Sequence, residues 1–318
     1  MTGAAKRDHG GGVDAAVARF GGVRGDWIDL STGINPRPYP IGDIPAEAWT
    51  RLPDSGAFLR LEQTAREFWN VPDRAAVVAA SGVSAIIAQM PAVLARAVVS
   101  IARPTYNEHE ASFRTAGFDV SDHGAIKVVV HPNNPDGRLV SVDEVLQNHR
   151  EVTIIDESFC DCSPDASVME LADRKGIVIL KGLGKFWGLA GLRLGFAIGD
   201  PVILARLSDK LGPWAVSGPA LAVGARALGD NRWATETRAR LDRDAARLDA
   251  LCGAGGLGPV GGTSLFRLYS CSNSDAVFGK LAEARILTRI FPYSDHWIRL
   301  GLPDTEDQWQ RLSDVFGV

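Results

Sequence analysis

The sequence lacks the long apolar stretches that export and membrane insertion require. Residues 1–10 contain no apolar core of a signal peptide, and no run reaches the ~18 apolar residues that span a bilayer. Cysteine is scarce, and its spacing shows neither the pairs of a zinc site nor the density of a disulfide scaffold: Cys160, Cys162, Cys252 and Cys271. We therefore expect a cytoplasmic protein with reduced thiols, no metal site and no membrane partner.

An excess of basic residues is also missing. The 34 Lys and Arg residues face 38 Asp and Glu residues, which gives a net charge of -4. This balance argues against nucleic acid as the main partner and leaves small molecules as the expected ones. The 318 residues, of which 46% are hydrophobic, can bury a large core in roughly two domains.

Apolar runs typical of strands alternate with amphipathic segments through the middle of the chain. Helix-like segments lie at 83–94 and 142–149. The strand-like runs cover residues 75–80, 97–101, 127–130, 152–155, 177–180 and 194–198. This alternation predicts an α/β layer with a mostly parallel sheet.

From near residue 218 the composition shifts to Ala, Arg and Leu and predicts helix, with a break at 229–231 and a helix end at 252–256. A smaller α+β unit is predicted after it, with strands at 263–268, 286–290 and 297–300 and helices at 274–284 and 305–316. We predict an N-terminal arm over 1–45, a large domain over 46–212, and an interdomain helix with a small C-terminal domain over 213–318.

Three strand ends carry residues that suit catalysis. Lys185 follows an apolar run within a stretch holding five glycines between positions 182 and 195, and Arg193 lies eight residues further on. Asn134 follows the run at 127–130 in His-Pro-Asn-Asn-Pro-Asp-Gly, and Asp156 closes the run at 152–155. Loops at strand carboxyl ends bind ligands in such sheets, and a desolvated lysine near a cation is a candidate Schiff-base nucleophile.

This ordered series resembles the fold-type I pyridoxal-phosphate (PLP) enzymes of the aspartate and histidinol-phosphate aminotransferase group. The shared motifs are Asn-Pro-x-Asn-Pro-x-Gly, Asp-Glu-x-aromatic, and a lysine followed eight residues later by arginine. Within the group, the opening His9-Gly10-Gly11, the segment 29–36 and the stretch after Lys185 look most like the threonine-phosphate decarboxylases of cobalamin biosynthesis. The resemblance covers nearly the whole chain and implies a large PLP-binding domain with a smaller C-terminal domain.

The resemblance implies roles around the PLP ring. Lys185 would bind the cofactor covalently and then move protons, Asp156 would pair with the pyridine nitrogen, and Asn134 would bind the phenolic oxygen. Tyr106 would stack on the ring and completes the predicted catalytic set. From the residues alone, Lys185 could instead be a surface lysine, Asp156 a loop acid, Asn134 a turn former and Tyr106 a packing residue.

Further residues would hold the phosphate of the cofactor. The segment Ser81-Gly82-Val83 lies between a strand and a helix, where backbone N–H groups and the helix dipole favour an anion, and Arg193 would complete the site. Taken alone, Ser81 or Ser84 could be only a helix cap.

The substrate-binding residues implied by the resemblance lie near both ends of the chain. Arg299 matches the arginine that binds the substrate carboxylate, a planar anion suited to a guanidinium fork. The phosphorylated amino-acid substrate would also meet Asn134 and four N-terminal residues: His9, Gly10, Gly11 and Asn35. A homodimer is implied as well, because active sites in this family lie at the subunit interface.

Four positions depart from the family pattern. Gly182 replaces the usual hydroxyl residue, and Lys181 the usual arginine, so one side-chain contact to the cofactor phosphate is missing. Leu52 stands where many relatives have a tyrosine that reaches across the dimer, and Phe159 where aminotransferases often have a tyrosine. Weaker cofactor retention is the expectation that follows.

Three functions remain compatible with the sequence. The first is PLP-dependent decarboxylation of O-phospho-L-threonine to (R)-1-amino-2-propanol phosphate for cobalamin synthesis. The second is an aminotransferase acting on histidinol phosphate or a similar substrate, which would need 2-oxoglutarate. The third is a degenerate PLP-fold binding partner. The orientation of the substrate bond that breaks separates the first two, and the sequence does not give it.

Overall fold

The computed structural model describes residues 9–318, and its contacts divide the chain into two compact units. Among the described residues, unit 1 comprises 9–37, Pro135–Gly137 and Ala239–Val318, and unit 2 comprises Pro38–Asn134 and Arg138–Arg238. The contacts thus group N-terminal residues with the C-terminal ones, where the sequence suggested a separate arm. The domain boundaries at 45 and 212 stay a prediction.

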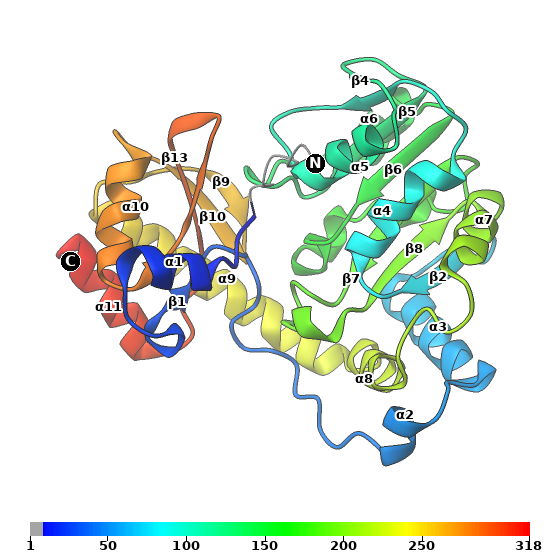
Figure 1. Ribbon diagram of the computed structural model, residues 1–318, viewed down its shortest axis with the longest axis horizontal. Coiled ribbons are helices and arrows are strands. Elements are labelled where there is room, and N and C mark those ends of the chain that lie inside the picture. Colours follow the sequence, from blue (N-terminus) through cyan, green and yellow to red (C-terminus); the bar gives the residue numbers. More distant parts are fainter. Residues whose placement is uncertain (1–8) are drawn as a thin grey trace. The chain divides into compact units, whose positions relative to one another are not determined.

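Unit 2 is built on a seven-stranded sheet in the order β2-β8-β7-β6-β5-β3-β4 (Figure 1). Strand β8 is antiparallel to both neighbours, and the remaining pairs are parallel. The strands are β2 (Ala76–Ala80), β3 (Val99–Ile101), β4 (Val120–Ser121), β5 (Ile126–Val130), β6 (Val152–Asp156), β7 (Ile177–Gly182) and β8 (Gly195–Gly199). The six predicted strands and the mostly parallel α/β sheet are confirmed.

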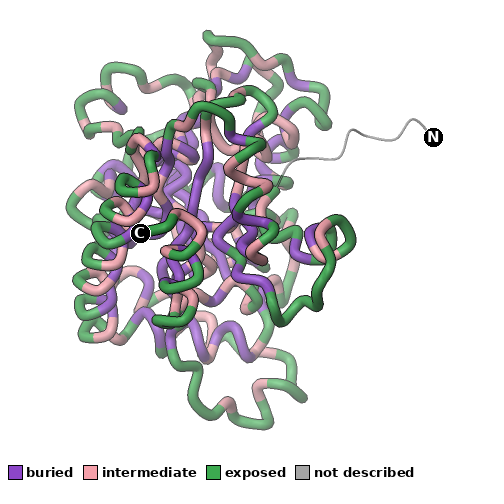
Figure 2. The backbone as a smooth tube through the Cα atoms, turned by 90° about the vertical axis from the view of Figure 1, so that its left-hand side faces the viewer, coloured by how far each residue is buried: buried purple, intermediate pink, exposed green. Residues whose placement is uncertain are grey.

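The strands consist mainly of apolar residues because helices cover the faces of the sheet. Every residue of β7 and β8 is buried, as expected where helices cover a parallel sheet. In Figure 2 the buried colour gathers in the inner segments of the chain, and the exposed colour concentrates in the outer loops and helices.

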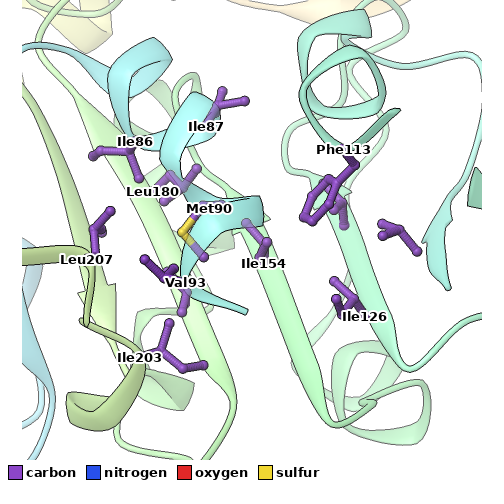
Figure 3. Packing of buried hydrophobic residues seen from close by; sticks show 14 of the residues in the cluster. Ile86, Ile87, Met90, Val93, Phe113, Ile126, Ile154, Leu180, Ile203 and Leu207 are labelled. Carbon is purple, nitrogen blue, oxygen red and sulfur yellow. The ribbon is translucent and has the colours of Figure 1, made fainter. Parts of the chain in front are cut away.

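One hydrophobic cluster packs helices of unit 2 against the sheet. Ile86, Met90 and Val93 of α4 (Val83–Val93) lie beside Ile154 of β6 and Leu180 of β7 (Figure 3). The cluster extends to α5 (Asn107–Thr115) and α7 (Pro201–Leu211). The other helices of unit 2 are α2 (Ala46–Thr50), α3 (Ser55–Trp69), α6 (Val142–Gln147) and α8 (Gly218–Leu228).

Unit 1 combines both ends of the chain. Helix α1 (Val13–Phe20) packs with α10 (Ser274–Glu283), and β1 (Ile28–Asp29) pairs in parallel with β11 (Ile286–Leu287). A four-stranded antiparallel sheet has the order β12-β13-β10-β9. Its strands are β9 (Gly258–Thr263), β10 (Phe266–Ser270), β12 (Arg289–Phe291) and β13 (Ser294–Gly301), and α11 (Glu306–Phe316) ends the chain.

The predicted strand at 263–268 is wrong in its bounds. Strand β9 ends at Thr263 and β10 begins at Phe266, because the Thr263 hydroxyl accepts a hydrogen bond from the Leu265 backbone N–H at 3.1 Å and closes a turn. The glycine-rich residues before Thr263 gave no strand signal. The break at 229–231 is confirmed, since α8 ends at Leu228 and α9 (Asn231–Ala254) begins after it.

Within residues 9–318, no helix has both the length and the apolar character needed to cross a bilayer.

Candidate active site

A cavity of about 170 Å³ lies in unit 2 where β5, β6 and β7 end. Its wall brings together seven of the residues predicted to bind the cofactor: Gly82, Val83, Tyr106, Asn134, Asp156, Lys185 and Arg193. Ser81 is not part of this wall, because its hydroxyl donates to the Ala215 carbonyl at 2.6 Å. Ser84, one helical position further on than Val83, lines the cavity instead.

The Asp156 carboxylate is buried and held by two residues that the sequence analysis did not single out. His109 Nε2 lies 2.8 Å from Oδ2, and the Ser158 hydroxyl donates to Oδ1 at 2.5 Å. Burial alone would raise the pKa of Asp156, but the hydrogen bonds from His109 and Ser158 outweigh it, so the pKa lies below its usual range. Asp156 is therefore an anion at neutral pH.

Tyr106 and Asn134 lie on two loops that are bonded to each other. The Thr105 hydroxyl donates to Asn133 Oδ1 at 2.6 Å, and Asn133 Nδ2 donates to the Pro104 carbonyl at 3.0 Å. Tyr106 also meets His109 edge to face, with ring centroids 6.1 Å apart. These contacts fix the positions of Tyr106 and Asn134 beside Asp156.

Lys185 projects from the loop after β7 into the same wall. Its Nζ lies 5.3 Å from the centre of the Phe159 ring, close enough for a cation–π contact. Phe159 is buried and lines the cavity. Phe159 therefore offers the cavity an apolar ring that has no hydroxyl.

The cavity has a cradle for an anion at the N-terminus of α4. Helix α4 begins after Gly82, which has φ 92°, and a Cβ at Gly82 would lie 2.5 Å from Arg193 Nη2. The guanidinium therefore sits against bare backbone at a helix N-terminus. Backbone N–H groups, the helix dipole and Arg193 together suit a phosphate.

Two of the departures from the family pattern have a structural account. A Cβ at Gly182 would lie 2.8 Å from Val83 Cγ2, so the valine side chain occupies the space of a longer residue at 182. Lys181 does not line the cavity. It is 2% exposed and binds Glu157 and Asp161 at 2.7 and 3.2 Å.

The possible metal-ligand atoms of His131, Glu157 and Cys160 lie within 4.8 Å of one another, yet each residue already has a protein partner, which for the Cys160 thiol is the Ser163 carbonyl. His131 Nε2 lies 2.6 Å from the Ala166 carbonyl, and Nδ1 accepts from the Val140 N–H. Glu157 binds Lys181, and burial raises the pKa of the Cys160 thiol. This group is a packed hydrogen-bonded cluster.

The predicted substrate residues all lie in unit 1, apart from Asn134. His9, Gly10 and Gly11 line an open hollow of about 600 Å³ together with Ser31, Thr288 and Arg289. The Gly11 N–H donates to the Ser31 hydroxyl at 2.7 Å. Arg289 is a cation in this wall that the sequence analysis did not name.

Asn35 and Arg299 are buried in unit 1 and are not part of that hollow. Asn35 Oδ1 accepts from Arg240 at 2.7 Å and from the Arg37 N–H at 3.0 Å. Arg299 donates to the Ser31 carbonyl at 2.5 Å, and its guanidinium carbon lies 4.9 Å from the Phe266 ring centre. The Ser31 carbonyl and hydroxyl thus connect Arg299 to the segment that carries Gly11.

The chain is similar to known proteins along its length. The family described as aminotransferase class I and II matches residues 121–315. A threonine-phosphate decarboxylase of Sinorhizobium sp is 37% identical over 325 residues, covering 96% of each chain, and one of Pseudomonas aeruginosa is 37% identical over 322 residues with the same coverage. The crystal structure of a histidinol-phosphate aminotransferase from Sinorhizobium meliloti in complex with pyridoxal-5'-phosphate has a TM-score of 0.79 at 17% identity, covering 98% of this chain and 96% of that one.

Proposed function

The chain belongs to the class I and II aminotransferase family, in the branch of its threonine-phosphate decarboxylase relatives, and we propose on this premise that it decarboxylates O-phospho-L-threonine. The product is (R)-1-amino-2-propanol phosphate, the precursor of the aminopropanol linker of cobalamin. The observation that carries the proposal is the similarity to two decarboxylases over nearly the whole chain. The protein is a PLP-dependent enzyme.

The residues of the unit 2 cavity fit PLP. A buried anion, Asp156, suits a protonated pyridine nitrogen, and an uncovered backbone at Gly82 beside the Arg193 guanidinium suits a phosphate. Lys185 and Asn134 share this wall. When bound, PLP supplies an electron sink for the electron pair left at the substrate α-carbon.

Each residue then has a task that its surroundings permit. Lys185 Nζ would bind the cofactor and would move a proton at the substrate α-carbon. Asp156, kept ionised by His109 and Ser158, would hold the proton on the pyridine nitrogen. Asn134 would bind the phenolic oxygen, the Tyr106 ring would orient the cofactor ring, and the N–H groups at the start of α4 with Arg193 would bind the phosphate.

Cofactor retention is expected to be weak, because no hydroxyl is present at Gly182 and Val83 fills the adjacent space. The remaining phosphate contacts come from backbone, Ser84 and Arg193. Titration of the purified protein with PLP measures this, and a dissociation constant below about 1 μM would contradict it.

Unit 1 supplies the residues proposed for the substrate anions. Arg299 takes the carboxylate, and His9, Gly10, Gly11 and Asn35 take the substrate phosphate, with Arg289 as a further cation in the hollow that His9 lines. Replacing His9 by Ala should raise KM for O-phospho-L-threonine and leave kcat nearly unchanged. An unchanged KM would remove His9 from the substrate site.

A homodimer is part of the proposal. Trp49, Leu52 and Leu59 of the α2 and α3 region are 67%, 68% and 63% exposed, and they are the apolar surface that we expect a partner to cover. A second copy of this chain is the partner that the family implies. Light scattering of the purified protein tests this, and a fully active monomer would contradict it. The cytoplasmic location also stays a prediction.

Product analysis tests the function. The purified protein is incubated with PLP and O-phospho-L-threonine, with and without 2-oxoglutarate, and the products are identified by mass spectrometry. Aminopropanol phosphate formed without 2-oxoglutarate supports the decarboxylase. A keto product that requires 2-oxoglutarate would replace it with an aminotransferase, and no product with bound PLP would redirect the search to other phosphorylated amines.

A further inference from the structure

A cluster of three buried charges lies beside the proposed PLP cavity and is not used by the proposed chemistry. Lys181 Nζ contacts Glu157 Oε2 at 2.7 Å and Asp161 Oδ1 at 3.2 Å, and the three residues are 2%, 1% and 4% exposed. Burial alone would lower the pKa of Lys181, but the two carboxylates outweigh it and raise the pKa. Lys181 is therefore a cation, and it belongs to the protein interior.

The Asp161 carboxylate also accepts two indole N–H groups. Trp69 Nε1 of α3 donates to Oδ1 at 3.0 Å, and Trp187 Nε1 donates to Oδ2 at 3.1 Å. Lys181 stands four residues before Lys185 and Trp187 two residues after it. One carboxylate thus binds both flanks of the loop that carries Lys185.

The same cluster reaches the strand end that carries Asp156. Glu157 follows Asp156 directly, and its carboxylate accepts from the Val168 N–H at 2.8 Å and the Ser167 hydroxyl at 2.7 Å as well as from Lys181. Every carboxylate oxygen of Glu157 and Asp161 has a partner. A buried ionic cluster of this kind gains little stability over apolar residues of the same volume, so its value lies in the single geometry that it specifies.

We propose that Asp161 is a positioning residue that fixes the loop of Lys185 through Lys181 on one flank and Trp187 on the other. The inference rests on the proposed function, because that function gives Lys185 its task. Asp161 touches neither cofactor nor substrate in this account. Its effect is to hold Nζ of Lys185 at a constant place relative to Asp156.

The two indoles offer a matched test. Trp187→Phe and Trp69→Phe each remove one N–H donor from the same carboxylate and keep an aromatic ring, and the two tryptophans are 0% and 7% exposed. Only Trp187 belongs to the Lys185 loop. Trp187→Phe should lower kcat about 10-fold, with KM for O-phospho-L-threonine little changed, and should weaken PLP binding several-fold, because a small misplacement of a reacting group is costly.

Trp69→Phe should lower the melting temperature as much as Trp187→Phe does but leave kcat and the PLP dissociation constant within about twofold. Equal effects of both variants on kcat and on PLP binding would overturn the proposal, since they would show a general loss of packing. A Trp187→Phe protein that binds PLP and turns over like the unaltered enzyme would overturn it as well.

A second pair of variants covers the case in which Trp187→Phe does not fold. Asp161→Asn and Glu157→Gln each remove one negative charge from Lys181, but only the first alters the acceptor of Trp187. The proposal expects the larger loss of PLP affinity and of kcat for Asp161→Asn, and equal losses would contradict it. Lys185→Met distinguishes a failure of the proposed function from a failure of the Asp161 proposal. If this variant still forms product, the proposed role of Lys185 is wrong. If it forms none, the tryptophan pair and the acid pair of variants test Asp161 alone.

Discussion

Lys181 and Lys185 lie four residues apart on the chain, yet their surroundings differ in almost every respect. Lys181 is 2% exposed, bound to two carboxylates and backed by Trp69, whereas Lys185 faces a cavity with the Phe159 ring 5.3 Å from its Nζ. The adjacent acids divide in the same way. Asp156 lines the cavity, and Glu157 turns to Lys181 in the interior.

This contrast shows that one end of a sheet can carry two kinds of site, a cavity that a ligand can enter and a buried ionic cluster that fixes the geometry beside it. Successive residues at a strand end point to opposite sides, so Asp156 and Glu157 serve two regions although they are neighbours. On the interior side, the carboxylates of Glu157 and Asp161 are paired with the Lys181 ammonium. The cavity side keeps Lys185 at the surface of a space that a ligand can enter. Substitutions on the two sides should therefore give different readouts.

The largest effect is expected on the cavity side, for Lys185→Met. Product formation should fall by at least about 10³-fold, because the residue that moves the proton at the substrate α-carbon is removed. The melting temperature should stay within a few degrees, because Lys185 is only half-buried and lies in the wall of the cavity. Mass spectrometric product assays and thermal unfolding of the same preparation measure both, and substantial residual turnover would contradict the assignment.

The same substitution on the interior side, Lys181→Met, should lower the free energy of unfolding by about 3–5 kcal/mol, because it leaves the carboxylates of Glu157 and Asp161 buried without their cation. Urea unfolding followed by fluorescence measures this. Lys185→Met is the matched control. A loss below about 1 kcal/mol would mean that the two lysines are energetically alike.

Acid should act on the interior side through Glu157. Burial opposes ionisation, but Lys181 and the hydrogen bonds from Ser167 and Val168 outweigh it, so the pKa of Glu157 is lowered in the folded state. Its contribution to stability is then present above the unfolded pKa of about 4.3 and is lost as the pH falls through the folded pKa.

The measurement is the free energy of unfolding between pH 6 and pH 3. We expect it to fall less steeply for Glu157→Gln than for the unaltered protein, with a difference of ~1 kcal/mol or more. Glu283→Gln, at an exposed residue of α10, is the control. Parallel slopes for all three proteins would contradict the lowered pKa of Glu157.

The smallest effect is expected for Phe159→Tyr, on the cavity side. A tyrosine hydroxyl could donate a hydrogen bond to the phenolic oxygen of PLP and lower the pKa of the Lys185–cofactor group. The pH midpoint of the visible absorbance should then fall by about 0.5 to 1 unit. An unchanged midpoint would refute this account of Phe159.

The residues at strand ends could be predicted from sequence because each lies in a short local pattern. Lys185, Asp156 and Asn134 each follow an apolar run, and the structure brings all three to one cavity. The side chains that hold these residues and their loops in place could not be predicted from the sequence. His109 lies 47 positions from Asp156 and Trp69 lies 92 positions from Asp161, so no local periodicity connects them.

Ser81 shows a different limit of the sequence. It stands at the right place before a helix, but its hydroxyl turns to the Ala215 carbonyl, 134 positions away, and Ser84 takes a place in the cavity wall. The sequence predicts one strand over 263–268 and misses β9, because glycines mask the alternation on which strand prediction depends. Side-chain direction and glycine-rich strands both depend on tertiary contacts.

The pairing of β1 with β11 has a consequence for synthesis. A chain leaves the ribosome from its N-terminus, and domains generally fold in that order. The backbone of Ile28 and Asp29 therefore stays without its strand partner until Ile286 and Leu287 have left the ribosome. We expect nascent chains that stop near residue 240 to protect the sheet of unit 2 from proteolysis but to leave residues 9–37 open to cleavage. Full protection of that segment requires the completed chain.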